Sequence, residues 1–317
     1  MAKSNIAIEL TDVDKHFGAV HANDKVSLSV KTGTIHGIVG ENGAGKSTLM
    51  SILYGFYQSD SGQIKVFDKE FRATSSKQSI EAGIGMVHQH FMFVDNFTVL
   101  ENVILGSEGG ALISESLSKA RVELTRLAKE YGLEVELDVA VEELSVGMQQ
   151  RVEILKGLYK GAKVLILDEP TGVLTPQESD ELFRIFEALK KQGVTIILIT
   201  HKLREIMSIT DYVSVMRAGK MVAHRQTSET NPEELAELMI GRKVLLNIVK
   251  TEAKSGNPLL IANNLEIYNE QGIKRVSEVS FEARSGEILG IAGVTGNGQG
   301  TLLKALAGIL PLSKGSI

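Results

Sequence analysis

Two hydrophobic patterns alternate along most of the chain. Short runs of Ile, Val and Leu predict strands buried on both faces, over residues 34–40, 163–169 and 194–200. Amphipathic stretches predict helices over residues 46–56 and 176–193. This alternation is typical of a largely parallel sheet flanked by helices.

The helix predicted over residues 176–193 has a well-marked start. Thr175 is placed to cap it, Pro176 suits its first position, and Glu178 would complete a capping box. Its apolar residues recur at helical spacing and should face the core: Leu182, Ile185, Phe186 and Leu189.

The composition narrows the class of protein. Of 317 residues, 43% are hydrophobic and 23% are charged, as in an ordinary globular protein. A net charge of −5 argues against a protein that binds nucleic acid over an extended surface. The lack of cysteine excludes a disulfide and a cysteine-ligated zinc site. No secretory signal is visible, and every apolar run is shorter than the roughly 20 residues that span a bilayer. If the protein acts at a membrane, we therefore expect it to do so by binding a membrane protein.

The stretch GENGAGKST, residues 40–48, matches a phosphate-binding loop, and it follows a predicted strand and opens a predicted helix. Glycines let backbone N–H groups curl around phosphate oxygens, and the helix N-terminus adds partial positive charge. Lys46 would reach the β- and γ-phosphates, and the Ser47 hydroxyl would ligate Mg²⁺. The alternative is a glycine-rich turn that only caps a helix, which the Lys–Ser pair and the flanking elements disfavour.

A second motif, KVLILDEP, delivers Asp168 and Glu169 to the end of a buried strand. The Asp168 carboxylate would hold the Mg²⁺, directly or through water, and Glu169 would polarise the attacking water as general base. Two solvated acids at a strand end are the alternative. Lys46 upstream disfavours it, because phosphoryl transfer needs metal and base together.

Three further features are weak when taken singly. The stretch LSVGMQQR, residues 144–151, would by itself be a helix cap. His201 follows a predicted strand directly, where a lone His is usually incidental, and Gln89 alone has no meaning.

The order of these features changes their weight. A phosphate loop, a Gln, an L-S-x-G helix start, a D-E strand end and a His occur in that order in the ATP-binding-cassette (ABC) ATPases, which the chain resembles over residues 5–245. The resemblance implies an α/β P-loop NTPase with a RecA-like core, an antiparallel β subdomain and a helical signature subdomain. It also implies that two cassettes sandwich ATP and Mg²⁺, each completing the other's site.

The family's roles carry over to matching residues. Phe17 would stack on adenine, Gln89 would link the Mg²⁺ and the lytic water to the membrane partner, and His201 would contact the γ-phosphate. Ser145 and Gly147 would bind the γ-phosphate of an ATP held by the opposite cassette. The implied ATP-binding residues are Phe17, Gly40, Asn42, Gly43, Gly45, Lys46, Ser47, Thr48, Ser145 and Gly147. The implied Mg²⁺ ligands are Ser47, Gln89 and Asp168, and the implied catalytic residues are Lys46, Gln89, Glu169 and His201.

Two departures from the family pattern point to a subgroup. Val146 and Met148 replace the third and fifth residues of the signature L-S-G-G-Q, and Thr175 stands where Asp is common, although it also serves as a helix cap. In both departures the chain resembles the importer ATPases that serve sugars and nucleosides. Among these, its closest resemblance is to the nucleoside-uptake group.

An internal repeat follows. Residues 25–64 align without gaps to residues 278–317, and the two segments are identical at 15 of 40 positions. The second copy is expected to keep the strand, loop and helix, but Gln299 replaces the lysine and Gly300 the serine. Backbone N–H groups of its loop could still cradle a nucleotide, but fast hydrolysis is not expected there, so we predict that hydrolysis belongs to the Lys46 site.

The repeat and the resemblance together predict the domains. We expect a complete cassette over residues 1–245, a linker over 246–257, and the N-terminal part of a second cassette over 258–317 with exposed apolar strands. The resemblance implies a tandem protein with two complete cassettes, of which this chain looks like a part.

The resemblance places the protein at the cytoplasmic face of the cell membrane. Its expected partners are transmembrane permease subunits, a second cassette of the same full-length chain and, indirectly, an extracytoplasmic substrate-binding protein, with no nucleic acid. One alternative is a soluble tandem ATPase acting on ribosomes or DNA, which the acidic charge and the lack of a long charged linker disfavour. Another is a nucleotide kinase, which the L-S-x-G start and the repeat disfavour.

Overall fold

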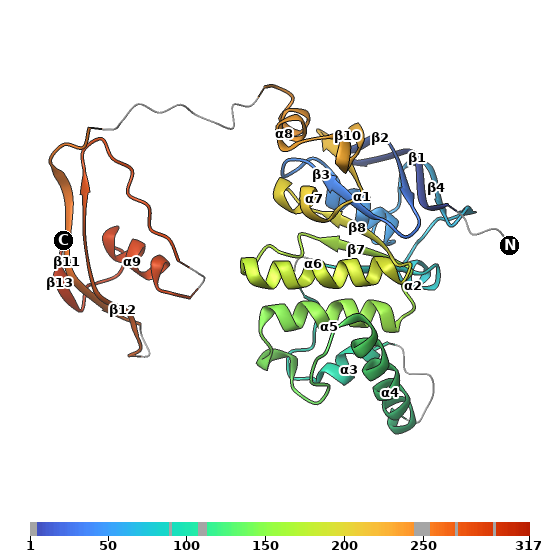
Figure 1. The fold of residues 1–317 in the computed structure, drawn as a ribbon, viewed down its shortest axis with the longest axis horizontal. Coiled ribbons are helices and arrows are strands. Elements are labelled where there is room, and N and C mark those ends of the chain that lie inside the picture. Colours follow the sequence, from blue (N-terminus) through green and yellow to red (C-terminus); the bar gives the residue numbers. More distant parts are fainter. Residues whose placement is uncertain (1–4, 89–90, 107–112, 244–253, 270–271, 294–295) are drawn as a thin grey trace. The chain divides into compact units, whose positions relative to one another are not determined.

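The computed structural model describes residues 5–88, 91–106, 113–243, 254–269, 272–293 and 296–317, with the side chains of residues 113–116 excepted. The chain divides into two compact units, residues 1–244 (unit 1) and 245–317 (unit 2) (Figure 1). Most of the linker expected over residues 246–257 lies outside the described residues.

Unit 1 is built on a six-stranded sheet with the order β10-β9-β3-β8-β7-β6. The strands from β9 to β6 run parallel, and β10 joins β9 in antiparallel pairing at one edge. The strands are β3 (Ile35–Val39), β6 (Ile84–Val87), β7 (Val164–Asp168), β8 (Thr195–Ile199), β9 (Tyr212–Arg217) and β10 (Lys220–Gln226). Every residue of β3, β7 and β8 is buried, which confirms the prediction of strands covered on both faces, and the same holds for β6, which was not predicted.

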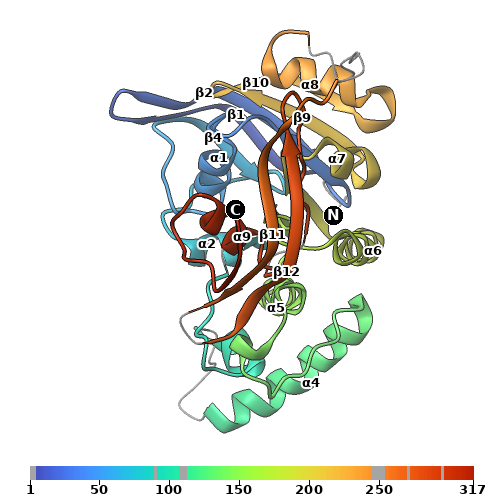
Figure 2. The same cartoon turned by 90° about the vertical axis from the view of Figure 1, so that its left-hand side faces the viewer.

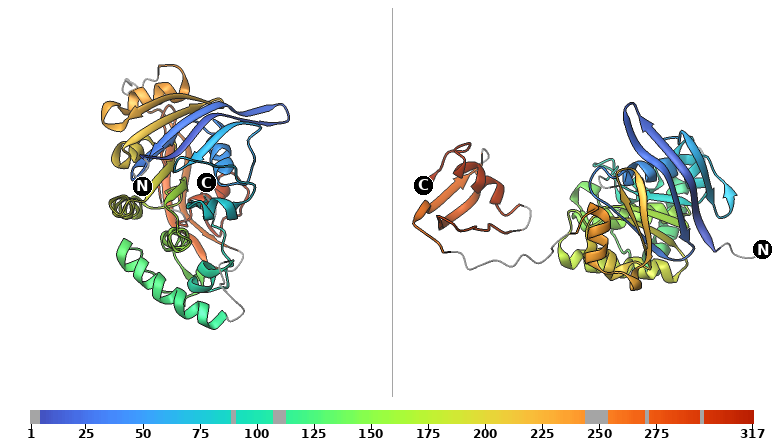
Figure 3. Two further views of the ribbon diagram at one scale, coloured as in Figure 1. Left: turned by 90° about the vertical axis from the view of Figure 1, so that its right-hand side faces the viewer. Right: turned by 90° about the horizontal axis from the view of Figure 1, so that it is seen from above.

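A second, antiparallel sheet of unit 1 has the order β2-β1-β4-β5. Its strands are β1 (Ile6–Phe17), β2 (Val20–Lys31), β4 (Ser61–Val66) and β5 (Lys69–Glu70). Together with helix α1 (Lys46–Leu53) it covers one face of the central sheet, where Ile38, Ile166 and Ile197 join its core. The long β1–β2 hairpin, in dark blue, projects beyond the body of the unit (Figures 2 and 3).

Helices cover the other face of the central sheet. Alternate strand residues such as Leu165, Leu167 and Leu198 point into this second core. The covering helices are α5 (Val146–Tyr159) and α6 (Pro176–Lys191), while α3 (Val99–Ile104) and α4 (Ile113–Tyr131) pack against α5 on its side away from the sheet (Figure 1). The other helical segments are α2 (Ser76–Glu81), η1 (Val141–Glu143), α7 (Leu203–Ile209), η2 (Thr227–Glu229) and α8 (Pro232–Ile240). Among the described residues, no helix is both long and apolar enough to cross a bilayer.

The local signals for helices were largely right. Thr175 caps α6 and forms a capping box with Glu178, and the four apolar residues predicted to face the core are buried. Helix α1 ends at Leu53, earlier than the predicted residue 56, because Gly55 turns the chain into the left-handed region at φ 83°.

Unit 2 repeats the antiparallel hairpin of unit 1. Its sheet has the order β12-β11-β13, and its elements are β11 (Pro258–Tyr268), β12 (Lys274–Arg284), α9 (Gln299–Leu306) and β13 (Lys314–Ser316). Even an irregularity recurs: Asp12 at φ 49° donates its N–H to Ser27, and Asn264 at φ 45° donates its N–H to Ser280. Ser27 and Ser280 are equivalent in the repeat, so the two hairpins share one bulged geometry.

The strand expected before the second loop does not form. Residues 288–292, which correspond to β3, have no strand pairing, and Ile288 is 91% exposed. The prediction that the second copy keeps its strand is therefore wrong. In unit 1, β3 is held between β8 and β9, and unit 2 supplies no such neighbours among its described residues.

Candidate nucleotide-binding site

The loop between β3 and α1 adopts a backbone that requires glycine. Gly43 and Gly45 have φ values of 82° and 98°, in the left-handed region. A Cβ atom on Gly45 would lie 2.2 Å from the carbonyl oxygen of Ala22 on β2. The loop is therefore packed against the hairpin, and it leads into the N-terminus of α1, where backbone N–H groups favour a negatively charged ligand.

Lys46 is folded back over this loop. Its Nζ donates hydrogen bonds to the carbonyls of Gly40 at 2.8 Å and Glu41 at 3.0 Å, and the residue is only 6% exposed. Burial lowers the pKa of Lys46, while the nearby carboxylates of Glu169 and Asp168 act in the opposite direction. The result is a cation held at the mouth of the loop beside two acids.

Asp168 ends β7 next to the first turn of α1. The Ser47 hydroxyl hydrogen-bonds to its carboxylate. Burial raises the pKa of Asp168, and the Ser47 hydrogen bond partly offsets that effect. A hydroxyl and a carboxylate in contact form the hard oxygen pair that suits Mg²⁺, so these residues fit the expected ion.

Glu169 and His201 meet at the adjoining ends of β7 and β8. The Oε1 atom of Glu169 lies 2.8 Å from Nδ1 of His201. The backbone N–H of Glu169 donates to the carbonyl of Ile199 at 2.9 Å, while its φ is 47°. A left-handed glutamate backbone is uncommon, and the bond to Ile199 helps to hold it in place.

Phe17 ends β1 with its side chain available for stacking. The residue is 42% exposed, and Tyr57 contacts its ring edge-on at a centroid distance of 5.1 Å. Lys15 Nζ lies 5.4 Å from the ring centroid. A half-exposed aromatic ring on a hairpin that packs against the phosphate loop is well placed to receive a purine.

The signature residues lie apart, at the start of α5. Ser145 caps this helix by accepting from the Met148 N–H at 3.3 Å. A Cβ on Gly147 would lie 3.1 Å from Glu178 Oε1 of α6. Val146 and Met148 are 40% and 37% exposed, so this helix start presents an apolar surface to solvent.

The remaining predicted residues are partly described. Asn42 and Ser47 are exposed at the loop, and Thr48 is half-buried. Gln89 lies outside the described residues.

Two supporting features escaped prediction. Asn23, fully buried on β2, donates from Nδ2 to the Gly45 carbonyl at 3.1 Å and so ties the hairpin to the loop. Glu205, 6% exposed, accepts from the hydroxyls of Thr171 and of Thr200, the latter at 2.9 Å. Its carboxylate therefore joins the segment after Glu169 to the segment that carries His201. A Glu four residues after the His was the available signal for it.

The second loop keeps the cradle without the cation. Gly296 and Gly298 have φ values of 95° and 91°, and a Cβ on Gly298 would lie 2.2 Å from the carbonyl oxygen of Arg275. Arg275 is the repeat equivalent of Ala22. The amide of Gln299 folds back against Gly293, as Lys46 folds toward Gly40.

Comparison with known proteins finds the family and its relatives. Residues 23–172 match the family model described as ABC transporter. The chain is 47% identical to the nucleoside import ATP-binding protein NupA of Lactococcus lactis, over 98% of this chain and 61% of that protein. It is 46% identical to the guanosine import ATP-binding protein NupO of Bacillus subtilis, with 98% and 61% covered. It is 43% identical to the glucose import ATP-binding protein TsgD13 of Haloferax volcanii, with 98% and 62% covered.

A solved structure shares the cassette fold. The crystal structure of the ADP conformation of MJ1267, an ATP-binding cassette of an ABC transporter, matches with a TM-score of 0.65 and 28% identity, over 75% of this chain and 99% of that one. The chain itself spans about three fifths of the length of the curated relatives, 61–62%. Residues 23–172, which hold the phosphate loop and the D-E strand end, therefore form a domain of the ABC transporter family.

Proposed function

We propose that this chain is the ATP-binding and ATP-hydrolysing part of an ABC importer at the cytoplasmic face of a membrane. One observation carries the proposal: Lys46, the Ser47–Asp168 pair and the Glu169–His201 pair gather at one edge of the central sheet. A buried cation, two hard oxygen ligands and an oriented carboxylate are the parts that phosphoryl transfer requires.

The loop would hold the phosphates of ATP. Its N–H groups and Lys46 stabilise their negative charge, and Phe17 stacks on the adenine. Ser47 and Asp168 would hold Mg²⁺, with Gln89 as the family's third ligand. When bound, this ion neutralises charge on the phosphate oxygens.

Glu169 would activate the attacking water. Its carboxylate accepts a proton as the water oxygen bonds to the γ-phosphorus, and the bond from that phosphorus to the bridging oxygen breaks to release ADP. His201, held 2.8 Å from Glu169, would orient the carboxylate and, as in the family, would contact the γ-phosphate.

The exposed start of α5 supports a sandwich with a second cassette. Ser145 and Gly147 have their described contacts within α5 and α6, which leaves this helix end open to the nucleotide of a partner cassette. Permease subunits and, indirectly, an extracytoplasmic binding protein complete the assembly. The relatives are named as import proteins for nucleoside, guanosine and glucose. These names support a nucleoside or a simple sugar as the cargo.

Glu169→Gln in the importer assembled with its permease tests the assignment. We expect ATP turnover to fall by about 10³-fold while ATP affinity is kept, because a general base contributes roughly 10²–10⁴-fold. The matched control is Glu237→Gln, an exposed residue of α8. Unchanged phosphate release by Glu169→Gln would remove Glu169 as the base.

A further inference from the structure

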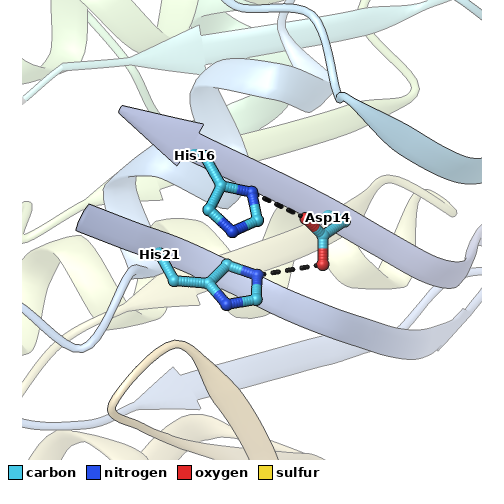
Figure 4. A group of neighbouring side chains, drawn as sticks. All are labelled: Asp14, His16 and His21. Carbon is cyan, nitrogen blue, oxygen red and sulfur yellow. Dashed lines mark hydrogen bonds and ion pairs between the residues drawn. The ribbon is translucent and has the colours of Figure 1, made fainter. Parts of the chain in front are cut away.

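Three side chains converge on the β1–β2 hairpin, outside the residues assigned to the nucleotide. Asp14 and His16 come from β1 and His21 from β2 (Figure 4). The strand register pairs His16 directly with His21. Their rings therefore stack, with centroids 3.8 Å apart and planes inclined by 15°.

Both rings face the same carboxylate. Nδ1 of His16 lies 3.1 Å from one oxygen of Asp14, and Nε2 of His21 lies 2.9 Å from the other. One ligand atom from each of the three residues lies within 4.8 Å of the other two. A tetrahedral ion with bonds of about 2.0–2.1 Å holds its ligand atoms about 3.3–3.4 Å apart, so small ring rotations would admit one.

Two further carboxylates lie beside the cluster, but Asp14 alone is not paired with a lysine side chain among the contacts described. Asp60 and Asp24 lie nearby, with carboxylate oxygens 3.7 Å from His16 Nδ1 and 3.9 Å from His21 Nδ1. Each of these outer acids is paired with a lysine side chain, Asp60 with Lys15 and Asp24 with Lys220. Asp14 instead faces the two imidazoles and a backbone N–H from Lys25 at 3.4 Å.

We propose that Asp14, His16 and His21 bind a divalent transition metal ion of the zinc type. Two imidazoles and one carboxylate form a three-ligand set that suits zinc and leaves a fourth position for water. This donor set differs from the oxygen ligands of the Mg²⁺ site. The site is open to solvent, because the His16 and His21 side chains are 50% and 36% exposed.

The metal site adjoins Phe17, the residue proposed to stack on adenine, in the sequence. Phe17 directly follows His16, so an ion that fixes His16 restrains the backbone that carries the ring. We therefore expect the bound metal to raise nucleotide affinity by preorganising Phe17. This second effect rests on the proposed function, whereas metal binding itself does not.

The first experiment titrates Zn²⁺ into the metal-stripped 317-residue chain by calorimetry. We expect a single equivalent to bind, and we expect that binding to be lost in His16→Ala, His21→Ala and Asp14→Asn. His224→Ala, an exposed residue of β10, is the matched control and should keep it. His201→Ala accounts for zinc held by the Glu169–His201 pair and should also keep it.

Each other outcome overturns the site. The site is excluded if the wild type binds no zinc, or if the three cluster variants bind zinc as tightly as the wild type. It is also excluded if only His201→Ala loses zinc binding. Far-UV circular dichroism of each variant checks the fold, and Asp14→Asn, which keeps side-chain size, decides the result if a histidine variant unfolds.

The second experiment measures binding of a fluorescent ATP analogue with and without zinc. A zinc-dependent gain in affinity in the wild type, absent from His21→Ala, supports the coupling. Zinc binding with unchanged nucleotide affinity overturns the coupling and leaves the site standing. Failure of the zinc-free chain to bind any nucleotide counts against the proposed function instead.

Discussion

The two phosphate-loop copies share left-handed glycines but differ in their surroundings. Gly45 and Gly298 both take left-handed conformations and both lie against a carbonyl of the preceding hairpin. Upstream the copies diverge, because β3 is buried between β8 and β9 while residues 288–292 form no strand. The loop and helix thus depend on local sequence and one hairpin, and the strand depends on its neighbours.

The largest expected effect comes from making the first loop chemically like the second. Lys46→Gln gives it the side chain of Gln299 and removes the buried cation of the loop. We expect ATP hydrolysis by the assembled importer to fall by about 10³-fold, the upper range for loss of one preorganised donor. Phosphate release measures it, with Lys69→Gln on β5 as control. Hydrolysis near the wild-type rate would mean that the lysine does not separate the copies.

A matched pair of cavity mutations tests the difference in packing. Ile38 is fully buried in β3, and its repeat equivalent Ile291 is 41% exposed. Ile38→Ala should lower the free energy of unfolding of unit 1 by about 3 kcal/mol. Ile291→Ala should change that of unit 2 by less than about 0.5 kcal/mol. Urea unfolding monitors both, and equal losses at the two positions would contradict the contrast.

A buried histidine gives the smallest effect, and it depends on pH. His36 of β3 is 4% exposed and its Nε2 lies 2.7 Å from Ser214 Oγ, while its equivalent in unit 2 is Leu289. Burial lowers the pKa of His36 from 6.5 to about 3. The unfolded chain therefore binds more protons between these values, so this stability is complete above pH 6.5 and is lost as the pH falls towards 3.

His36→Leu should remove that dependence. Between pH 7 and pH 5 the wild type should lose about 2 kcal/mol more of unfolding free energy than the variant, because only it carries this histidine. Urea unfolding at both pH values measures the difference. Parallel losses in the two proteins would show that His36 does not titrate as its burial requires.

The sequence predicted the parts of the fold that are set by hydrophobic run length and by caps. The central strands lie within one residue of the predicted ranges, and α6 begins at Pro176 as expected. The frame of the nucleotide site was also predictable, since Lys46, Asp168 and Glu169 sit at the ends of these elements.

Features set by distant packing were not predictable. The left-handed backbone of Glu169 depends on its bond to Ile199 of the next strand. The role of Asn23 depends on how the hairpin meets the phosphate loop, and the His16–His21 pairing depends on irregular strand register. The prediction of a strand at residues 288–292 failed for the same reason. Hydrophobic periodicity shows which conformation a segment prefers, but it does not show which strands will pair with it.

The glycines of the two loops have a consequence for scanning genomes. Gly45 and Gly298 each lie too close to a carbonyl, of Ala22 and of Arg275, to carry a Cβ atom, whatever residue follows them. A search that weights glycine spacing will therefore retrieve both stretches with equal ease. The single letter after the last glycine, lysine at position 46 and glutamine at 299, is what would sort a catalytic loop from a supporting one.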